Sequence, residues 1–152
     1  DQTVEVPSVA GLIGDKLLTI GPATLGIPLG KNKEAHRLKH IFDIATLSRK
    51  EYKIEEVKKS VFGCMKQENA IQKTEFGIKE VIDDTIDFCS QPLKYEERPD
   101  ENLFEKETYI YEIAYGFNEF REHLFSMDYT WPRFKEDCQA IIDIFEKLKK
   151  IL

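Results

Sequence analysis

The sequence predicts a mainly α-helical bundle preceded by one short β-strand. Apolar residues make up 41% and charged residues 33% of the 152 positions, with only six prolines, a composition typical of a folded helical domain. Over most of the chain, apolar residues recur at i, i+3 and i+4, which lines one face of a helix. A chain of this length can bury one hydrophobic core, so we expect a single domain over residues 1–152.

The expected elements follow from local patterns. Val4 and Val6 alternate with polar residues before Pro7, which predicts a short strand whose partner would lie upstream of residue 1. Ser8 can cap a helix that reaches about residue 20. Residues 21–30 hold three glycines and two prolines, which predicts a loop, and its other residues give it an apolar lining. Further helices are expected at about 33–47, 53–68, 72–90, 104–125 and 133–151.

Composition also divides the chain into two parts within this one domain. Residues 1–50 carry the strand, two helices, the loop and the candidate motifs, and residues 51–152 read as a plain helical bundle. The segment 91–102 contains two prolines and is the best linker candidate, and we expect it to join two helices of the same bundle.

Charge and cysteine content exclude several classes of protein. A net charge of -6 argues against binding nucleic acid through a general basic surface. No stretch approaches the roughly 20 apolar residues of a membrane span, and no leader pattern is present, so we expect a cytoplasmic protein without a membrane partner. Cys64, Cys89 and Cys138 are an odd number of widely spaced cysteines in apolar patterns. We expect them to be core thiols and not disulfides or zinc ligands.

Charged residues of the first two helices form the densest candidate site. If these helices pack as a hairpin, Asp15, Lys16, Lys39 and Asp43 would lie close together. A lysine can hold a phosphate as a point charge, and an aspartate can orient it or accept a proton. The alternative for Lys39 and Asp43 is an ordinary i, i+4 salt bridge, which the spacing alone favours.

The three histidines give a weaker signal. His36 and His40 are four residues apart on one helix, but no third ligand type matches their face, so we predict no metal site there. His123 lies near the end of its helix, where its charge would complement the helix dipole.

Three separated motifs resemble the nucleotidyltransferase AbiEii/AbiGii toxin family of type IV toxin–antitoxin systems. They are Gly14-Asp15-Lys16-Leu17, the loop 21–28, and Leu38-Lys39-His40-Ile41-Phe42-Asp43-Ile44, following Pro7-Ser8 in this order. In that family, a helix with an Asp-Lys-Leu motif is followed, after a similar loop, by a helix with Lys-x-Leu-(Tyr/Phe)-Asp. The likeness is dense over residues 6–47 and only compositional beyond.

The resemblance implies the C-terminal helical domain of a DNA polymerase β-like nucleotidyltransferase, used in toxin–antitoxin and phage-defence systems. By the same resemblance, Lys16 would contact nucleotide phosphates and Asp43 would support the catalytic centre. Asp15 and Lys39 belong to the same motifs, and His40 stands where other members carry a different polar residue. We take these three as candidate substrate contacts.

The family also has parts that this sequence lacks. Its members place a Gly-Ser turn and a metal-binding Asp-x-Asp pair before these motifs, so we expect the present segment to be inactive alone. The resemblance implies Mg²⁺ and a nucleoside triphosphate for the complete enzyme, with no cofactor held by this segment. The implied partners are its own N-terminal catalytic domain, the nucleotide, an antitoxin protein and an RNA acceptor.

A second hypothesis belongs to another class of function. The chain would be a non-catalytic helical module that binds an antitoxin or another protein. Aromatic residues that look exposed in the sequence favour it: Tyr109, Tyr111, Tyr115 and Trp131. For Trp131 itself, burial in the core is the simpler interpretation.

Overall fold

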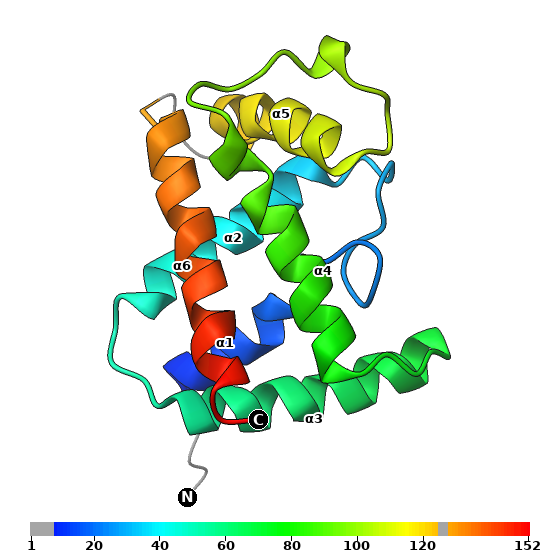
Figure 1. Cartoon of the computed structure of the whole chain (residues 1–152), viewed down its shortest axis with the longest axis vertical. Coiled ribbons are helices and arrows are strands. Elements are labelled where there is room, and N and C mark those ends of the chain that lie inside the picture. Colours follow the sequence, from blue (N-terminus) through cyan, green and yellow to red (C-terminus); the bar gives the residue numbers. More distant parts are fainter. Residues whose placement is uncertain (1–7, 125–127) are drawn as a thin grey trace, which may run out of the picture.

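The computed structural model describes residues 8–124 and 128–152, and these residues form a helical bundle (Figure 1). The prediction of a mainly α-helical bundle is confirmed, and no strand occurs within the described ranges. The predicted strand at Val4 and Val6 falls outside them. The α-helices are α1 Val9–Leu17, α2 Glu34–Ser48, α3 Ile54–Gln72, α4 Ile78–Ser90, α5 Tyr109–Glu119 and α6 Trp131–Lys149.

The helices enclose one core. In Figure 1, α4 and α6 lie side by side, α3 crosses their lower end and α5 lies across the upper end. Helix α1 packs on α3 and on α2, and α2 also contacts α5 and α6. All six helices contribute residues to a single buried hydrophobic cluster. Burying one Leu or Ile side chain contributes about 1.5–3 kcal/mol, so this cluster supplies the main driving force for folding.

Two helices begin at a side-chain cap, the first of them at Ser8 as predicted. The Ser8 hydroxyl accepts a hydrogen bond from the Gly11 amide at 2.9 Å, which begins α1. The Thr130 hydroxyl accepts one from the Arg133 amide at 3.3 Å, and Pro132 follows in the first turn of α6. Side-chain caps satisfy amides that have no partner inside the helix.

The fourth helix begins later than predicted. Residues 72–90 were expected to be helical, but α3 extends to Gln72 and ends at Lys73, whose φ of 57° is left-handed. The Asn69 side chain then holds the turn, accepting hydrogen bonds from the Thr74 hydroxyl at 2.8 Å and the Phe76 amide at 3.0 Å. Helix α4 therefore starts only at Ile78.

The predicted helix over 104–125 is also shorter, because Thr108 caps α5 by accepting from the Tyr111 amide at 3.2 Å. Its last turn widens into a π-helix over Phe120–Leu124. The linker expected at 91–102 joins two helices of the bundle and contains two short 3₁₀ turns, Pro92–Lys94 and Glu101–Leu103.

The core confirms some expectations for single residues and corrects another. Cys89 and Cys138 are buried free thiols, as predicted, but Cys64 is only partly buried. Trp131 is 6% exposed and its ring meets that of Phe117 edge to face, with centroids 5.3 Å apart. The core interpretation of Trp131 is therefore confirmed.

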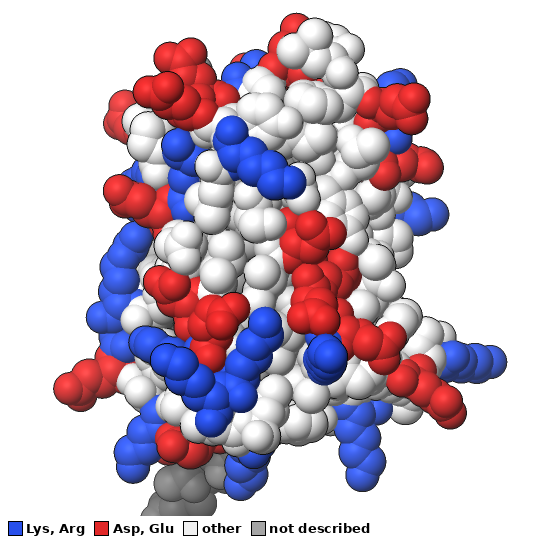
Figure 2. All heavy atoms as spheres, viewed as in Figure 1, with Lys and Arg blue, Asp and Glu red and all other residues white. Residues whose placement is uncertain are grey.

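The surface carries interspersed charges. Figure 2 shows acidic and basic side chains mixed over one face, with a run of acidic side chains in the region of α4. This face has no continuous basic surface. None of the described helices combines the length and apolar character that crossing a membrane requires.

Candidate functional site

The first two helices bring Lys16 and Asp43 together, as the hairpin hypothesis predicted. Lys16 lies in the last turn of α1 and Asp43 in the middle of α2. The Lys16 Nζ is 3.3 Å from Oδ2 of Asp43, and their side chains are 27% and 23% exposed. The ammonium is therefore held in place and remains open to solvent.

Lys39 joins the same carboxylate. Its Nζ lies 3.0 Å from Oδ2 of Asp43, one helical turn away, and the Lys39 side chain is 50% exposed. The ordinary i, i+4 salt bridge that the spacing favoured is thus present. However, the same oxygen also binds Lys16, so the pair belongs to a three-residue cluster that joins α1 and α2.

A pocket of about 430 Å³ opens beside this cluster. Its walls come from four segments: the end of α1, the loop at residues 25–28, His40 of α2, and one face of α3 from Cys64 to Gln72. The volume lies in the range of small-molecule sites, about 300–1,000 Å³. Asp15, Lys16 and His40 all line it, whereas Asp43, which binds Lys16, and Lys39 stand outside the lining.

His40 contributes a neutral imidazole to the pocket wall. Burial lowers its pKa, and the positive charge of Lys16 lowers it further. Its Nδ1 is buried and has no hydrogen-bond partner among the described residues. A buried polar atom without a partner is unusual, and a ligand or water that donated to it would remove the cost.

Asp15 points toward α3 and not toward Asp43. Its Oδ1 accepts a weak hydrogen bond from Cys64 Sγ at 3.7 Å. Burial, and then the charge of Asp15, raise the pKa of Cys64, so the thiol stays protonated and is a poor nucleophile. Cys64 was expected to be a core thiol, but it is only partly buried and lies in the pocket wall next to Asp15.

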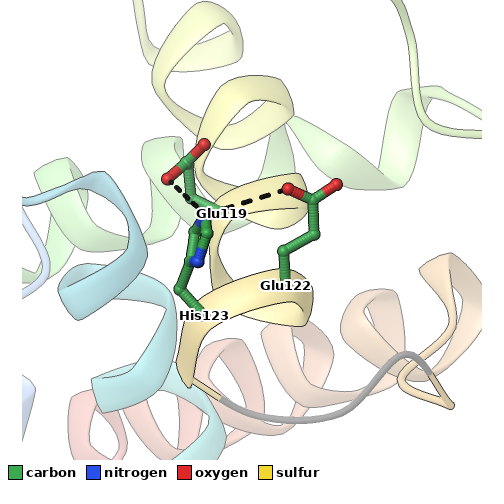
Figure 3. Close-up of side chains that lie close together, drawn as sticks. All are labelled: Glu119, Glu122 and His123. Atoms are coloured by element: carbon green, nitrogen blue, oxygen red, sulfur yellow. Dashed lines mark ion pairs between the residues drawn. The ribbon is translucent and has the colours of Figure 1, made fainter.

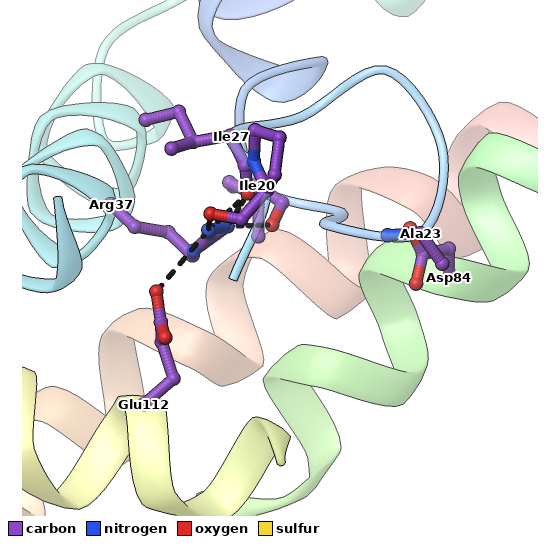
Figure 4. A network of polar contacts seen from close by, with 7 residues as sticks. Ile20, Ala23, Ile27, Arg37, Asp84 and Glu112 are labelled. Atoms are coloured by element: carbon purple, nitrogen blue, oxygen red, sulfur yellow. Dashed lines mark hydrogen bonds and ion pairs between the residues drawn. The ribbon is translucent and has the colours of Figure 1, made fainter. Parts of the chain in front are cut away.

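The loop that lines the pocket is held by a buried arginine that sequence reasoning missed. Arg37 of α2 is fully buried, and its Nη1 donates to the carbonyls of Ile20 at 3.1 Å and Ile27 at 2.7 Å. Its Nη2 donates to Ile27 and Pro28 and lies 3.4 Å from Oε1 of Glu112 (Figure 4). One guanidinium therefore ties the start and the end of the loop together.

Asp84 of α4 anchors the middle of the same loop. Its Oδ2 accepts hydrogen bonds from the Ala23 amide at 3.0 Å and the Thr24 hydroxyl at 2.9 Å. The Tyr109 hydroxyl donates to its other oxygen. A Cβ on Gly21 would lie 2.4 Å from Asp84 Oδ2, so this close approach requires glycine. This role of Asp84 in holding the loop was not predicted from the sequence.

The charge in the pocket is mixed. Among the described residues that line the pocket, Lys16 is the only Lys or Arg, and Asp15 and Glu68 supply two carboxylates. The pocket is therefore not a general anion site. It offers one oriented ammonium, one neutral imidazole and a fixed loop.

One further cluster has the residue types of a metal site. Glu119, Glu122 and His123 place their ligand atoms within 4.8 Å of one another at the end of α5 (Figure 3). His123 Nε2 is 3.6 Å from Glu119 and 3.9 Å from Glu122, and its side chain is 64% exposed. These exposed contacts account for the arrangement of the three side chains.

No protein-family model matches the chain, and no curated protein or solved structure matches it either. The resemblance to the AbiEii/AbiGii toxin family therefore rests on the three motifs in the first 47 residues.

Proposed function

We propose that this chain is the helical domain of a nucleotidyltransferase and that Lys16 binds the phosphates of a nucleotide. The observation that carries the proposal is the 3.3 Å contact between Lys16 and Asp43 at the mouth of a pocket. Asp43 fixes the direction of the ammonium, and the remaining donors of that ammonium are free for phosphate oxygens.

The second support is the set of hydrogen bonds that holds loop 21–28 in place. The buried Arg37 holds its backbone at both ends, and the partly buried Asp84 holds it in the middle. Taking a guanidinium out of water costs several kcal/mol unless its partners compensate. A loop fixed in this way presents a constant wall to a ligand, and such preorganisation favours binding.

The same geometry limits what the chain can do alone. Asp15 and Glu68 leave the pocket without net positive charge, so we expect weak binding of a polyphosphate to this chain. A complete site would add cations from another domain. In our proposal that domain also transfers the nucleotide to its acceptor.

Mg²⁺, which the resemblance implies, does not fit the residues of this pocket. Two-metal chemistry needs carboxylates that hold two ions about 3.5–4 Å apart. Among the described residues, the one cluster of three metal-ligand side chains is Glu119, Glu122 and His123, which lies outside the pocket. We therefore assign no step of the reaction to a metal held by these residues.

The test is a binding titration with the common ribonucleoside triphosphates and with inorganic triphosphate. We expect weak but saturable binding by calorimetry, and a loss of at least about tenfold for Lys16→Ala, since one charge-assisted contact contributes about 1.5–3 kcal/mol. Lys135→Ala on α6, outside the pocket, serves as the control. Equal binding by the Lys16→Ala and Lys135→Ala variants, or no binding at all, would contradict the proposal.

The alternative function, a module that binds an antitoxin or another protein, keeps one supporting observation. Tyr111 and Tyr115 are only partly buried on α5, and their rings stack on each other. Trp131 is buried and offers no contact surface, and the hydroxyl of the partly buried Tyr109 donates to Asp84. A direct binding measurement with a candidate partner, repeated with Tyr111→Ala, tests this alternative, and equal affinity would exclude that face.

A further inference from the structure

Two hollows adjoin on the surface between the start of α2 and the length of α5. Their volumes are about 340 and 350 Å³, and both are lined by Asn32, Glu34 and Tyr115. These three residues stand between the two hollows, and we consider the two together as one region of the surface. We call it the tyrosine groove, and it lies apart from the pocket that Lys16 lines, with no lining residue in common.

The centre of the tyrosine groove is aromatic. Tyr111 and Tyr115 are one helical turn apart on α5, and their rings are nearly parallel, with centroids 6.1 Å apart and an interplanar angle of 4°. Both side chains are half-buried. Parallel rings present flat faces on which a planar cation can stack, and this contact contributes about 0.5–1 kcal/mol at an exposed site and more when water is excluded.

The walls of the groove are acidic. Glu34 and Glu119 are partly buried and line it beside the rings, and Glu107 stands at its other end. Among the described lining residues, Lys106 is the single Lys or Arg, and His36 and His123 line the groove as well, with His123 Nε2 3.6 Å from Glu119. The charge of Glu119, and to a smaller extent burial and the charge of Glu34, raise the pKa of Tyr115.

The backbone at the rim is held in a rare conformation. Gly30, Asn32 and Glu107 all have left-handed φ values, 74°, 56° and 65°, and all three line the same hollow. Lys73 is the one other described residue of this kind. A left-handed glutamate costs about 1–2 kcal/mol, and strained residues gather at functional sites.

From these observations we infer that the tyrosine groove binds an arginine side chain from a basic segment of a partner protein. The guanidinium stacks on the tyrosine rings, and its N–H groups donate to the carboxylates of Glu34 and Glu119. Arginine fits better than lysine because its planar fork both stacks and bonds two carboxylates. The inference goes beyond the nucleotide proposal and does not depend on it, since the two sites share no lining residue.

The experiment compares three fluorescent peptides that are identical except at three positions, which carry arginine, citrulline or lysine. Citrulline keeps the shape of arginine and removes its charge. By anisotropy with the full chain, we expect the arginine peptide to bind about tenfold more tightly than the citrulline peptide, the lysine peptide to lie between them, and added salt to weaken binding. Equal binding of arginine and citrulline peptides, or no binding, would overturn the inference.

Variants of the chain locate the contact. Glu34→Gln with Glu119→Gln should weaken the arginine peptide about tenfold, and Glu55→Gln, an exposed residue of α3, should change nothing. Because Glu34 lies in the first turn of α2, far-UV circular dichroism must match the wild type. Tyr115→Leu gives a second measurement that leaves the carboxylates intact and should also weaken binding. If the double variant and Tyr115→Leu both bind as the wild type does, the inference is wrong.

Discussion

Asp43 accepts two ammonium groups on one oxygen, Lys16 Nζ at 3.3 Å and Lys39 Nζ at 3.0 Å. The first contact joins two helices and the second stays within one. Because Lys16 comes from the end of α1 while Asp43 lies in the middle of α2, this carboxylate sets where the Lys16 charge points relative to the pocket.

Asp43→Asn should separate the role of Asp43 in orienting Lys16 from its role in the stability of the fold. Asparagine keeps the shape but leaves the two ammonium groups without their shared counter-charge, so Lys16 should move and triphosphate binding should weaken. The loss in the free energy of unfolding should stay within about 1 kcal/mol, because the pair is partly exposed. Calorimetry and thermal unfolding measure the two effects, with the exposed Asp143→Asn on α6 as the control. A stability loss above about 3 kcal/mol would show that Asp43 is mainly structural.

Arg37→Met should destabilise the fold strongly. The substitution leaves Glu112 as a buried carboxylate without its cation and removes the donors of the Ile20 and Ile27 carbonyls. We expect a loss of about 3–5 kcal/mol in the free energy of unfolding, measured by urea denaturation. Adding Glu112→Met should recover only part of it, since the carbonyls still lack donors. Full recovery would mean that the loop contacts contribute little.

Two glycines in helices should respond in opposite directions to alanine. A Cβ on Gly14 of α1 would lie 2.4 Å from the Ser60 hydroxyl and 3.1 Å from the Val61 amide nitrogen, so Gly14→Ala should push α1 away from α3 and cost about 1–3 kcal/mol. A Cβ on Gly63 of α3 meets nothing within 4 Å, so Gly63→Ala should stabilise by about 0.5–1 kcal/mol. Thermal unfolding of both variants checks this, and a neutral Gly14→Ala would contradict the tight α1–α3 contact.

His40 should make stability fall in mild acid. Its pKa is lower in the folded state than in the unfolded chain, by burial first and the Lys16 charge second. The unfolded chain therefore binds the proton first, and the contribution of His40 is present above a pH of about 6.5 and lost as the pH falls below it. Burial raises the pKa of Glu112 and Asp137, which acts in the opposite direction. The measurement is thus the difference in the free energy of unfolding between wild type and His40→Asn, obtained by urea denaturation from pH 7 to 5. This difference should shrink as the pH falls. A constant difference would contradict this account.

The helices could be predicted because their apolar stripes are regular. The convergence of Lys16 with Asp43 was predicted on the assumption that the first two helices pack as a hairpin, and the structure shows this contact. Arg37 was missed although a signal was present, since it shares i, i+4 and i+7 spacing with the buried Ile41 and Ile44. An arginine on an apolar stripe is normally read as solvated. Its burial depends on the loop carbonyls and Glu112, which lie far away in sequence.

The helix boundaries at residues 72–78 and 104–109 were wrong for a related reason. Each turn there is set by a side chain that replaces helical hydrogen bonds, Asn69 in the first and Thr108 in the second. The tyrosine groove could not be predicted from the sequence either, because its parts come from the start of α2 and the length of α5. Spacing within one helix predicts its own face and not the surface that two helices make together.

The most direct test of the nucleotide proposal is to map amide chemical shifts of the ¹⁵N-labelled chain during a titration with inorganic triphosphate. The account predicts that the largest shifts occur at the end of α1, at Gly26 and Ile27 and at His40, and that they disappear in Lys16→Ala. Shifts of equal size in Lys16→Ala, or shifts concentrated on the basic end of α6 around Lys147 and Lys149, would contradict it.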